Sequence, residues 1–250
     1  MQPRRPRKKR GAAKRARTPW VPIIIVGIGA IAVVVAVVLG SALLRGGSSE
    51  VVIPAGIAER TARQQGPVLG EEDAPVTIVE YFRFDCIHCA DFARQTAPLI
   101  EKDFIVDKRV RFEARPLAVE GDILAASEAV ECAAEQGRYW DYHDVLFANF
   151  DKDPEGAYKS GRLKEYAAKL GLDTGPFNSC LDSHKYQQTV IDESKAAVQA
   201  GIQSTPTFFI GLTKDMKAET VPYAGEKTIS GAEKYEVFKA AIEEVLKKAQ

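Results

Sequence analysis

The stretch "FDCIHCADF" places Cys86 and Cys89 three positions apart with His88 between them. Two cysteines at this spacing can form half of a zinc site, a redox-active dithiol or a structural disulfide. A zinc site needs two more ligands, and the other two cysteines, Cys132 and Cys180, are far apart without a nearby cysteine partner. A disulfide across two residues constrains little chain. The spacing therefore favours redox chemistry.

A buried strand and a helix start are expected to position this pair. Residues 75–82, "PVTIVEYF", are rich in β-branched and aromatic residues, which is typical of a buried strand. A helical pattern follows, in which Pro98 should introduce a kink or an interruption. Free N–H groups and the helix dipole at a helix N-terminus stabilise a thiolate at Cys86. A protonated His88 would favour the same thiolate, whereas the carboxylate of Asp85 should oppose it.

The chain beyond the pair alternates between strand and helix patterns. Strands are predicted at residues 109–119, 205–211 and 221–225, and an amphipathic helix from residue 233 to 248. Only helical patterns occur from about residue 120 to 200. This order predicts an α/β sheet domain with an α-helical insertion.

Charge is distributed unevenly along the chain. Nine Lys or Arg residues occur between positions 4 and 17, and the chain from Glu50 onward has 24 basic and 34 acidic residues. Residues 21–44 are apolar and uncharged. As a helix they would be about 36 Å long, enough to cross a hydrocarbon core of about 30 Å. Because Trp20 lies at the edge and the basic excess lies before it, a single-pass anchor with a cytoplasmic N-terminus is predicted.

These patterns divide the chain into four parts. We expect a basic cytoplasmic stub at residues 1–20, a transmembrane helix at 21–44, a tether at 45–66 and an extracytoplasmic domain at 67–250. A cleaved signal peptide would have a shorter apolar region. A basic run next to a membrane span usually sets topology, so no nucleic-acid partner is expected. All four cysteines lie beyond the span, in an oxidising compartment where disulfides persist.

The residues around the cysteine pair resemble the DsbA family of thiol-disulfide oxidoreductases, which have a thioredoxin-like fold. The resemblance covers about residues 67–249 and depends on "VEYFRFDCIHC", on the helical insertion and on "STPTFFIG". It implies that Cys86 exchanges with substrate and that Cys89 is the resolving cysteine. His88 matches the histidine of the family motif. Glu80 matches an acidic residue that tunes proton transfer at the buried cysteine.

The same resemblance assigns roles to the second motif. Pro206 matches the family's cis-proline, and Thr205 before it would offer its backbone to a bound peptide as an extra strand. Ile87 departs from the family by replacing the usual proline between the two cysteines. Independently of the resemblance, two free thiols outside the cell would be exposed to oxidation, so we expect a structural disulfide between Cys132 and Cys180.

These observations predict a monomeric enzyme, anchored in the cell membrane, that introduces disulfide bonds into exported proteins without a metal or cofactor. The resemblance implies reduced exported proteins as substrates and a membrane-embedded, quinone-linked oxidase as the partner that reoxidises the dithiol. Two alternatives stay open, a disulfide reductase or isomerase and a metal-binding module or metallochaperone. Dimeric isomerases of similar type carry an N-terminal dimerisation domain, and the predicted tether leaves no room for one.

Overall fold

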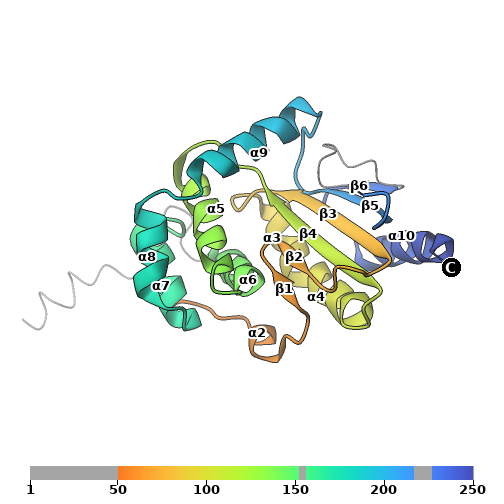
Figure 1. The fold of residues 1–250 in the computed structure, drawn as a ribbon, viewed down its shortest axis with the longest axis horizontal. Coiled ribbons are helices and arrows are strands. Elements are labelled where there is room, and N and C mark those ends of the chain that lie inside the picture. Colours follow the sequence, from red (N-terminus) through yellow and green to blue (C-terminus); the bar gives the residue numbers. More distant parts are fainter. Residues whose placement is uncertain (1–49, 152–155, 217–226, 250) are drawn as a thin grey trace, which may run out of the picture. The chain divides into compact units, whose positions relative to one another are not determined.

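The computed structural model describes residues 50–151, 156–216 and 227–249. The predicted basic stub at 1–20 and the predicted transmembrane helix at 21–44 lie outside these ranges. No helix within the described ranges is both long and apolar enough to cross a membrane. The domain that carries the cysteine pair can be followed in Figure 1.

A six-stranded sheet, in the order β1-β2-β4-β3-β5-β6, forms the centre of the described domain (Figure 1). The central strands β3 (Val76–Phe82) and β4 (Val110–Pro116) run parallel, and every other neighbouring pair is antiparallel. The remaining strands are β1 (Gln64–Gln65), β2 (Val68–Leu69), β5 (Thr207–Leu212) and β6 (Lys227–Ser230). All seven residues of β3 are buried, as expected for a β-branched and aromatic strand covered on both faces.

Helical segments cover both faces of this sheet. Because side chains alternate along a strand, Ile78 and Phe82 of β3 join one core cluster and Val79 and Tyr81 join another. The first cluster contains apolar residues of α3 (Ile87–Asp91), η1 (Phe92–Thr96), α4 (Ala97–Ile100), η2 (Glu101–Ile105) and α10 (Tyr235–Lys248). The second contains Ala197 of α9 (Gln187–Gln199). Cys89 belongs to the first and larger cluster, and Cys86 packs against it.

The helix that follows the cysteine pair is not broken at Pro98. The chain passes from α3 through the π-helical η1 into α4 and then η2. Pro98 lies in the first turn of α4, where its missing N–H is tolerated. In the π turn before it, the N–H of Ala97 donates to the carbonyl of Phe92, five residues earlier. The predicted interruption therefore takes the form of a π turn, and helical structure continues to Ile105.

The helical insertion lies between β4 and β5, close to the predicted range of about 120–200. Its described helices are α5 (Gly121–Ala134), α6 (Tyr139–Asn149), α7 (Ser160–Leu170), α8 (Thr174–Asp182) and α9 (Gln187–Gln199). In Figure 1, α5 to α8 gather at one end of the sheet, whereas α9 leads back towards the strands. The fold is the α/β domain with a helical insertion that the sequence predicts.

The described part of the expected tether, residues 50–66, packs against the domain. The side chain of Asn149 exchanges two hydrogen bonds of 2.8 Å with the backbone of Val52. Arg60, directly after α2 (Gly56–Glu59), is buried and forms ion pairs with carboxylates of η2 and α6. The structure therefore differs from the expectation of a tether here, because contacts with residues far along the chain hold this segment in place.

The sequence pattern does not predict two short strands, β1 at the edge of the sheet and β2 beside it. β1 and β2 have two residues each, too few for a periodic pattern to show. The strand predicted at residues 221–225 lies outside the described residues, and the described C-terminal strand is β6 at Lys227–Ser230.

Candidate active site

Cys86 occupies the N-cap position of α3, four residues after the end of β3. Its backbone is extended, with φ −91° and ψ 116°. Its sulfur accepts a hydrogen bond from the backbone N–H of Cys89 at 3.2 Å, in place of the side-chain oxygen that usually caps a helix. Both cysteines are free thiols in this structure. The predicted helix start at the cysteine pair is confirmed.

Hydrogen bonds lower the pKa of Cys86 from its ordinary value of 9.0 to about 5. The largest contribution is the hydrogen bond between the two cysteine side chains. Partial burial acts in the opposite direction, while the side chain of Thr205 and the backbone N–H groups of Cys89 and His88 lower the pKa further. The thiolate is therefore the form of Cys86 that this site stabilises at neutral pH.

Thr205 and Pro206 lie beside Cys86 although they are far from it in sequence. The bond between them is cis, as the resemblance implies. The carbonyl oxygen of Thr205 lies 3.4 Å from the sulfur of Cys86, across a sequence separation of 119 residues. The site thus lies between the start of α3 and the segment just before β5.

Cys89 is fully buried, and Glu80 lies close to it in the core. Burial raises the pKa of Cys89, and the hydrogen bond to Cys86 and the charge of Glu80 raise it further. Glu80 is paired on the sheet with Ala114 of β4 and Phe208 of β5 and is only 2% exposed. Burial, followed by the charge of Cys86, raises the pKa of Glu80 well above its ordinary range. The two cysteines are therefore chemically unequal.

The charged groups just before the pair are arranged differently from the sequence expectation. Asp85, expected to oppose the thiolate, accepts two hydrogen bonds from Arg83 at 2.9 and 2.8 Å. The hydrogen bond with Asp85 raises the pKa of Arg83, and the negative charges of Cys86 and Cys89 act in the same direction. Arg83 was not among the predicted site residues, although a basic residue two positions before the carboxylate of Asp85 could have indicated an ion pair. The side chain of His88 is exposed.

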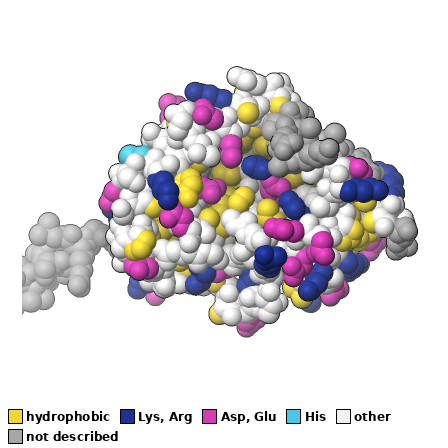
Figure 2. Space-filling view, in the orientation of Figure 1, with side chains coloured by type: hydrophobic (Ala, Val, Ile, Leu, Met, Phe, Trp, Pro, Cys, Tyr) yellow, Lys and Arg dark blue, Asp and Glu magenta, His cyan; other side chains and the backbone are white. Residues whose placement is uncertain are grey.

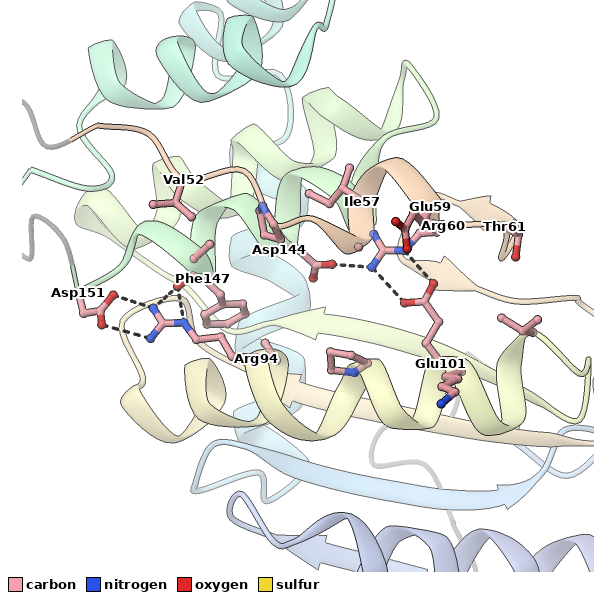
Figure 3. A pocket seen from close by; sticks show the side chains of 17 residues that line it. Val52, Ile57, Glu59, Arg60, Thr61, Arg94, Glu101, Asp144, Phe147 and Asp151 are labelled. Carbon is pink, nitrogen blue, oxygen red and sulfur yellow. Dashed lines mark hydrogen bonds and ion pairs between the residues drawn. The ribbon is translucent and has the colours of Figure 1, made fainter.

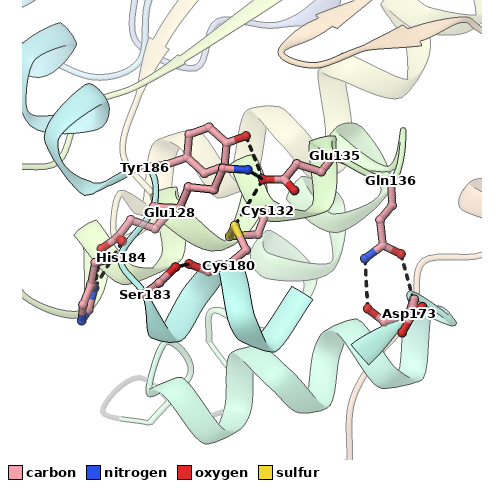
Figure 4. Close-up of a disulfide and its surroundings, with 10 residues drawn as sticks. Glu128, Cys132, Glu135, Gln136, Asp173, Cys180, Ser183, His184 and Tyr186 are labelled. Carbon is pink, nitrogen blue, oxygen red and sulfur yellow. Dashed lines mark hydrogen bonds and ion pairs between the residues drawn. A yellow bond between two sulfur atoms is a disulfide. The ribbon is translucent and has the colours of Figure 1, made fainter. Parts of the chain in front are cut away.

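A disulfide joins Cys132 of α5 to Cys180 of α8, as expected from the compartment (Figure 4). Polar contacts beside it hold the same two parts of the insertion together. Glu135 accepts hydrogen bonds from Lys185 at 2.7 Å and from Tyr186 at 2.9 Å. The disulfide and these contacts connect α5 to α8 and to the turn after it.

A pocket of about 750 Å³ lies between α2, the helical run after the cysteine pair, and α6 (Figure 3). Part of its charged lining is paired, because Arg94 binds Asp151 and Arg60 binds Glu101. None of the predicted site residues lines this pocket. The reactive sulfur is instead at the helix start, next to the cis-proline.

Comparison with known proteins agrees with this geometry. A family model described as thioredoxin matches residues 62–244. Disulfide bond formation protein D of Bacillus subtilis is 30% identical over 190 residues, which cover 72% of this chain and 77% of that protein. The chain belongs to the DsbA family of thiol-disulfide oxidoreductases. The crystal structure of alpha-DsbA1 from Wolbachia pipientis has the same fold as this DsbA-family chain, with a TM-score of 0.65 at 24% identity over 73% of this chain and 92% of that one.

This DsbA-family chain is also similar to part of a much longer protein. Na(+)/H(+) antiporter NhaA 3 of Salinispora tropica is 34% identical over 146 residues. The match covers 57% of this chain but 21% of the antiporter. The chain thus spans about a fifth of the length of that relative, and the similarity concerns only that part of it.

We expect Cys86 of this DsbA-family protein to titrate with a pKa of about 5. Because its pKa is lower in the folded than in the unfolded chain, the thiolate stabilises the reduced fold at high pH, and this stabilisation is lost as the pH falls through about 5. The ultraviolet absorbance of the thiolate, followed against pH in the reduced protein, measures the transition, and Cys86→Ser should abolish it. A midpoint near the ordinary thiol value would contradict the geometry.

Proposed function

We propose that this protein is an extracytoplasmic oxidoreductase that introduces disulfide bonds into exported proteins through its Cys86–Cys89 pair. The observation that carries the proposal is the inequality of the two sulfurs, a half-buried Cys86 with a pKa of about 5 and a buried Cys89 with a raised pKa. A stabilised thiolate favours the dithiol over the disulfide, and this makes the disulfide a stronger oxidant. An oxidase is therefore favoured over a reductase.

The reaction proceeds by two exchanges. A substrate thiolate attacks the sulfur of Cys86 in the oxidised enzyme, the Cys86–Cys89 bond breaks, and Cys89 leaves with the electron pair and takes up a proton. A second substrate thiolate then attacks the substrate sulfur of the mixed disulfide, and Cys86 leaves as its stabilised thiolate. Two electrons pass to the enzyme. Glu80, whose raised pKa allows it to hold a proton beside Cys89, is proposed to supply that proton.

Three further residues are proposed to act on the substrate side. The backbone of Thr205, 3.4 Å from the sulfur of Cys86 at its carbonyl, would pair with an extended peptide bound to that sulfur. Pro206 would keep this backbone beside the site. His88 is exposed two residues after Cys86, and its imidazolium form would favour the thiolate.

The reduction potential against glutathione tests this proposal. We expect a value above about −200 mV, in the range of strongly oxidising enzymes of this type. A value near the cytosolic poise, about −220 to −260 mV, would favour the reductase alternative. An isomerase would rearrange the disulfides of a scrambled substrate without added oxidant, and a substrate with mispaired disulfides separates that activity from net oxidation.

The metal-binding alternative requires a third ligand near the cysteine pair. Within the part of the chain that the structure describes, no group of three or more His, Cys, Asp or Glu side chains is placed to hold a metal ion. Metal analysis of protein purified without a chelator distinguishes this alternative directly, since a metallochaperone would retain about one equivalent of metal.

The proposed function places the domain outside the cytoplasm, with the apolar segment at residues 21–44 as its anchor. The sequence pattern supports this placement, because nine basic residues precede that segment and only Arg45 lies between it and Glu50. Reoxidation is assigned to a membrane-embedded, quinone-linked thiol oxidase. The enzyme is proposed to act as a monomer on reduced exported proteins.

A fusion experiment tests the topology. A reporter enzyme that is active only in the cytoplasm should be silent when it is fused after Gln250, because the domain is translocated. The same reporter fused after Pro19, before the apolar segment, should be active and serves as the matched control. Activity of the Gln250 fusion would place the cysteine pair in a reducing compartment and contradict the oxidase proposal.

A further inference from the structure

Two oppositely charged side chains lie between β3 and the reactive sulfur. Arg83 and Asp85 belong to the short segment that connects Phe82 to Cys86. The Nε and Nη2 atoms of Arg83 donate to the two carboxylate oxygens of Asp85 at 2.9 and 2.8 Å. Two parallel hydrogen bonds of this kind fix both the position and the orientation of the guanidinium group. The reaction steps described above use neither side chain.

An unpaired carboxylate at position 85 would act against the proposed chemistry. Asp85 directly precedes Cys86, and a negative charge so close to the sulfur disfavours the thiolate. Glu80, beneath the pair in the core, already carries the same sign when ionised. The motif contains two other ionisable side chains, the exposed His88 and the partly buried Asp91. Neutralisation of the charge of Asp85 therefore favours the thiolate that the hydrogen bonds at Cys86 stabilise.

A backbone turn brings Arg83 and Cys86 close together along the chain. The N–H of Cys86 donates to the carbonyl of Arg83 at 3.2 Å, which closes a tight turn over residues 83–86. Besides its bond to Asp85, Arg83 interacts with the negative charge of the Cys86 thiolate, which raises the pKa of Arg83 further. The guanidinium group is thus held by Asp85 at a point from which it acts on the cysteine pair.

We propose that the Arg83–Asp85 ion pair tunes the redox pair: Asp85 fixes the guanidinium of Arg83 beside Cys86, and Arg83 cancels the charge of Asp85 at the sulfur. This inference rests on the proposed redox function of Cys86 and Cys89. Arg83 acts through Cys86 and is a positioning residue, because the exchange reaction forms and breaks no bond at its side chain. The side chains are 47% and 37% exposed, so solvent and salt moderate the effect.

The two single charge changes should shift the pKa of Cys86 in opposite directions, and the double change should cancel the two shifts. Arg83→Gln leaves the charge of Asp85 unpaired and should raise the pKa of Cys86 by about half a unit to one unit, for a unit charge several ångströms from the sulfur in a largely aqueous setting. The disulfide should become less oxidising by the corresponding three- to tenfold in its glutathione equilibrium constant. Asp85→Asn leaves the cation and should lower the pKa. The double variant should return close to the wild type.

The experiment measures the thiolate titration and the glutathione equilibrium of all four proteins at low and at high salt. Arg63→Gln is the matched control, because it removes a similarly exposed guanidinium from a surface pair with Glu71, at 3.7 Å. Arg63 adjoins β1, which lies three strands away from β3 in the sheet. We expect this control to match the wild type and the shift of Arg83→Gln to shrink in high salt.

The outcomes separate this inference from the proposed function. A wild-type pair that does not exchange with glutathione would contradict the proposed function and the inference with it. A wild-type pair that exchanges normally, with an unchanged pKa and equilibrium constant in Arg83→Gln, would contradict the inference alone. The same holds if Arg83→Gln changes only the melting temperature, or if Arg63→Gln shifts the pKa as much as Arg83→Gln does.

Discussion

Cells that produce the Cys89→Ser protein should accumulate covalent adducts between Cys86 and exported proteins, whereas Cys86→Ser cells should contain few. Cys86 is half-buried, with a pKa of about 5, and is therefore the cysteine that we propose to react with substrates. Cys89 is buried, with a raised pKa, and we propose that it can also attack Cys86 in the mixed disulfide from inside the protein, which releases the substrate in its reduced form. Without that attacker the adduct persists, and we expect its amount to rise by at least about tenfold over the wild type.

A non-reducing gel of each variant, with antibody detection, measures these adducts. Reductant should dissolve them, and the Cys86→Ser/Cys89→Ser double variant should show only the background of the preparation. Because serine has nearly the same size as cysteine, folding should be preserved, and the melting temperature of each variant checks this. Equal trapping by Cys86→Ser and Cys89→Ser would show that the nucleophile is misassigned.

Removal of the second disulfide should destabilise the domain strongly without changing the redox pair. The Cys132–Cys180 bond closes a sequence separation of 48 residues. In the chain-entropy model, closing a loop of this length removes conformational entropy from the unfolded chain and raises its free energy by about 4 kcal/mol. We therefore expect Cys132→Ala/Cys180→Ala to lower the free energy of unfolding by several kcal/mol, measured by denaturant titration, while the pKa of Cys86 stays at about 5.

Selective reduction provides an independent check on the same bond. Cys132 is 1% and Cys180 6% exposed, so a small reductant reaches them far less readily than Cys86. After mild reduction and alkylation of the oxidised protein, mass spectrometry should find label on Cys86 and Cys89 alone. Equal labelling of all four cysteines, or an unchanged free energy of unfolding in the double alanine variant, would show that the second disulfide is not a structural one.

Much of the local framework of the site could be predicted from the sequence because it depends on neighbours along the chain. The strand predicted at residues 75–82 appears as β3, and the helix start predicted at the cysteine pair appears as α3 with Cys86 at its N-cap. Helix capping, strand alternation and the burial of a β-branched run each involve only a few successive residues. The hydrogen bond from the N–H of Cys89 to the sulfur of Cys86 follows from the same local geometry, whereas the raised pKa of Cys89 also depends on its burial in the core and on Glu80.

Contacts between segments far apart in the sequence could not be predicted from local patterns and are seen only in the tertiary structure. The carbonyl of Thr205 lies against Cys86 across 119 residues, a proximity that the sequence indicated through resemblance alone. The packing of residues 50–66 likewise depends on Asn149 and on carboxylates of η2 and α6, which no local pattern reveals. Such contacts exist because the sheet brings together strands from distant parts of the chain.

The effect of Asp85 shows why composition alone could not predict the electrostatics of the site. From the sequence, a carboxylate next to Cys86 should oppose the thiolate. In the folded chain the turn over residues 83–86 brings the guanidinium of Arg83 onto that carboxylate. The sequence by itself determined which charged groups are present near the nucleophile. Only the tertiary structure decided their net effect, because Coulomb energies depend on the distances between charges and on their exposure to solvent.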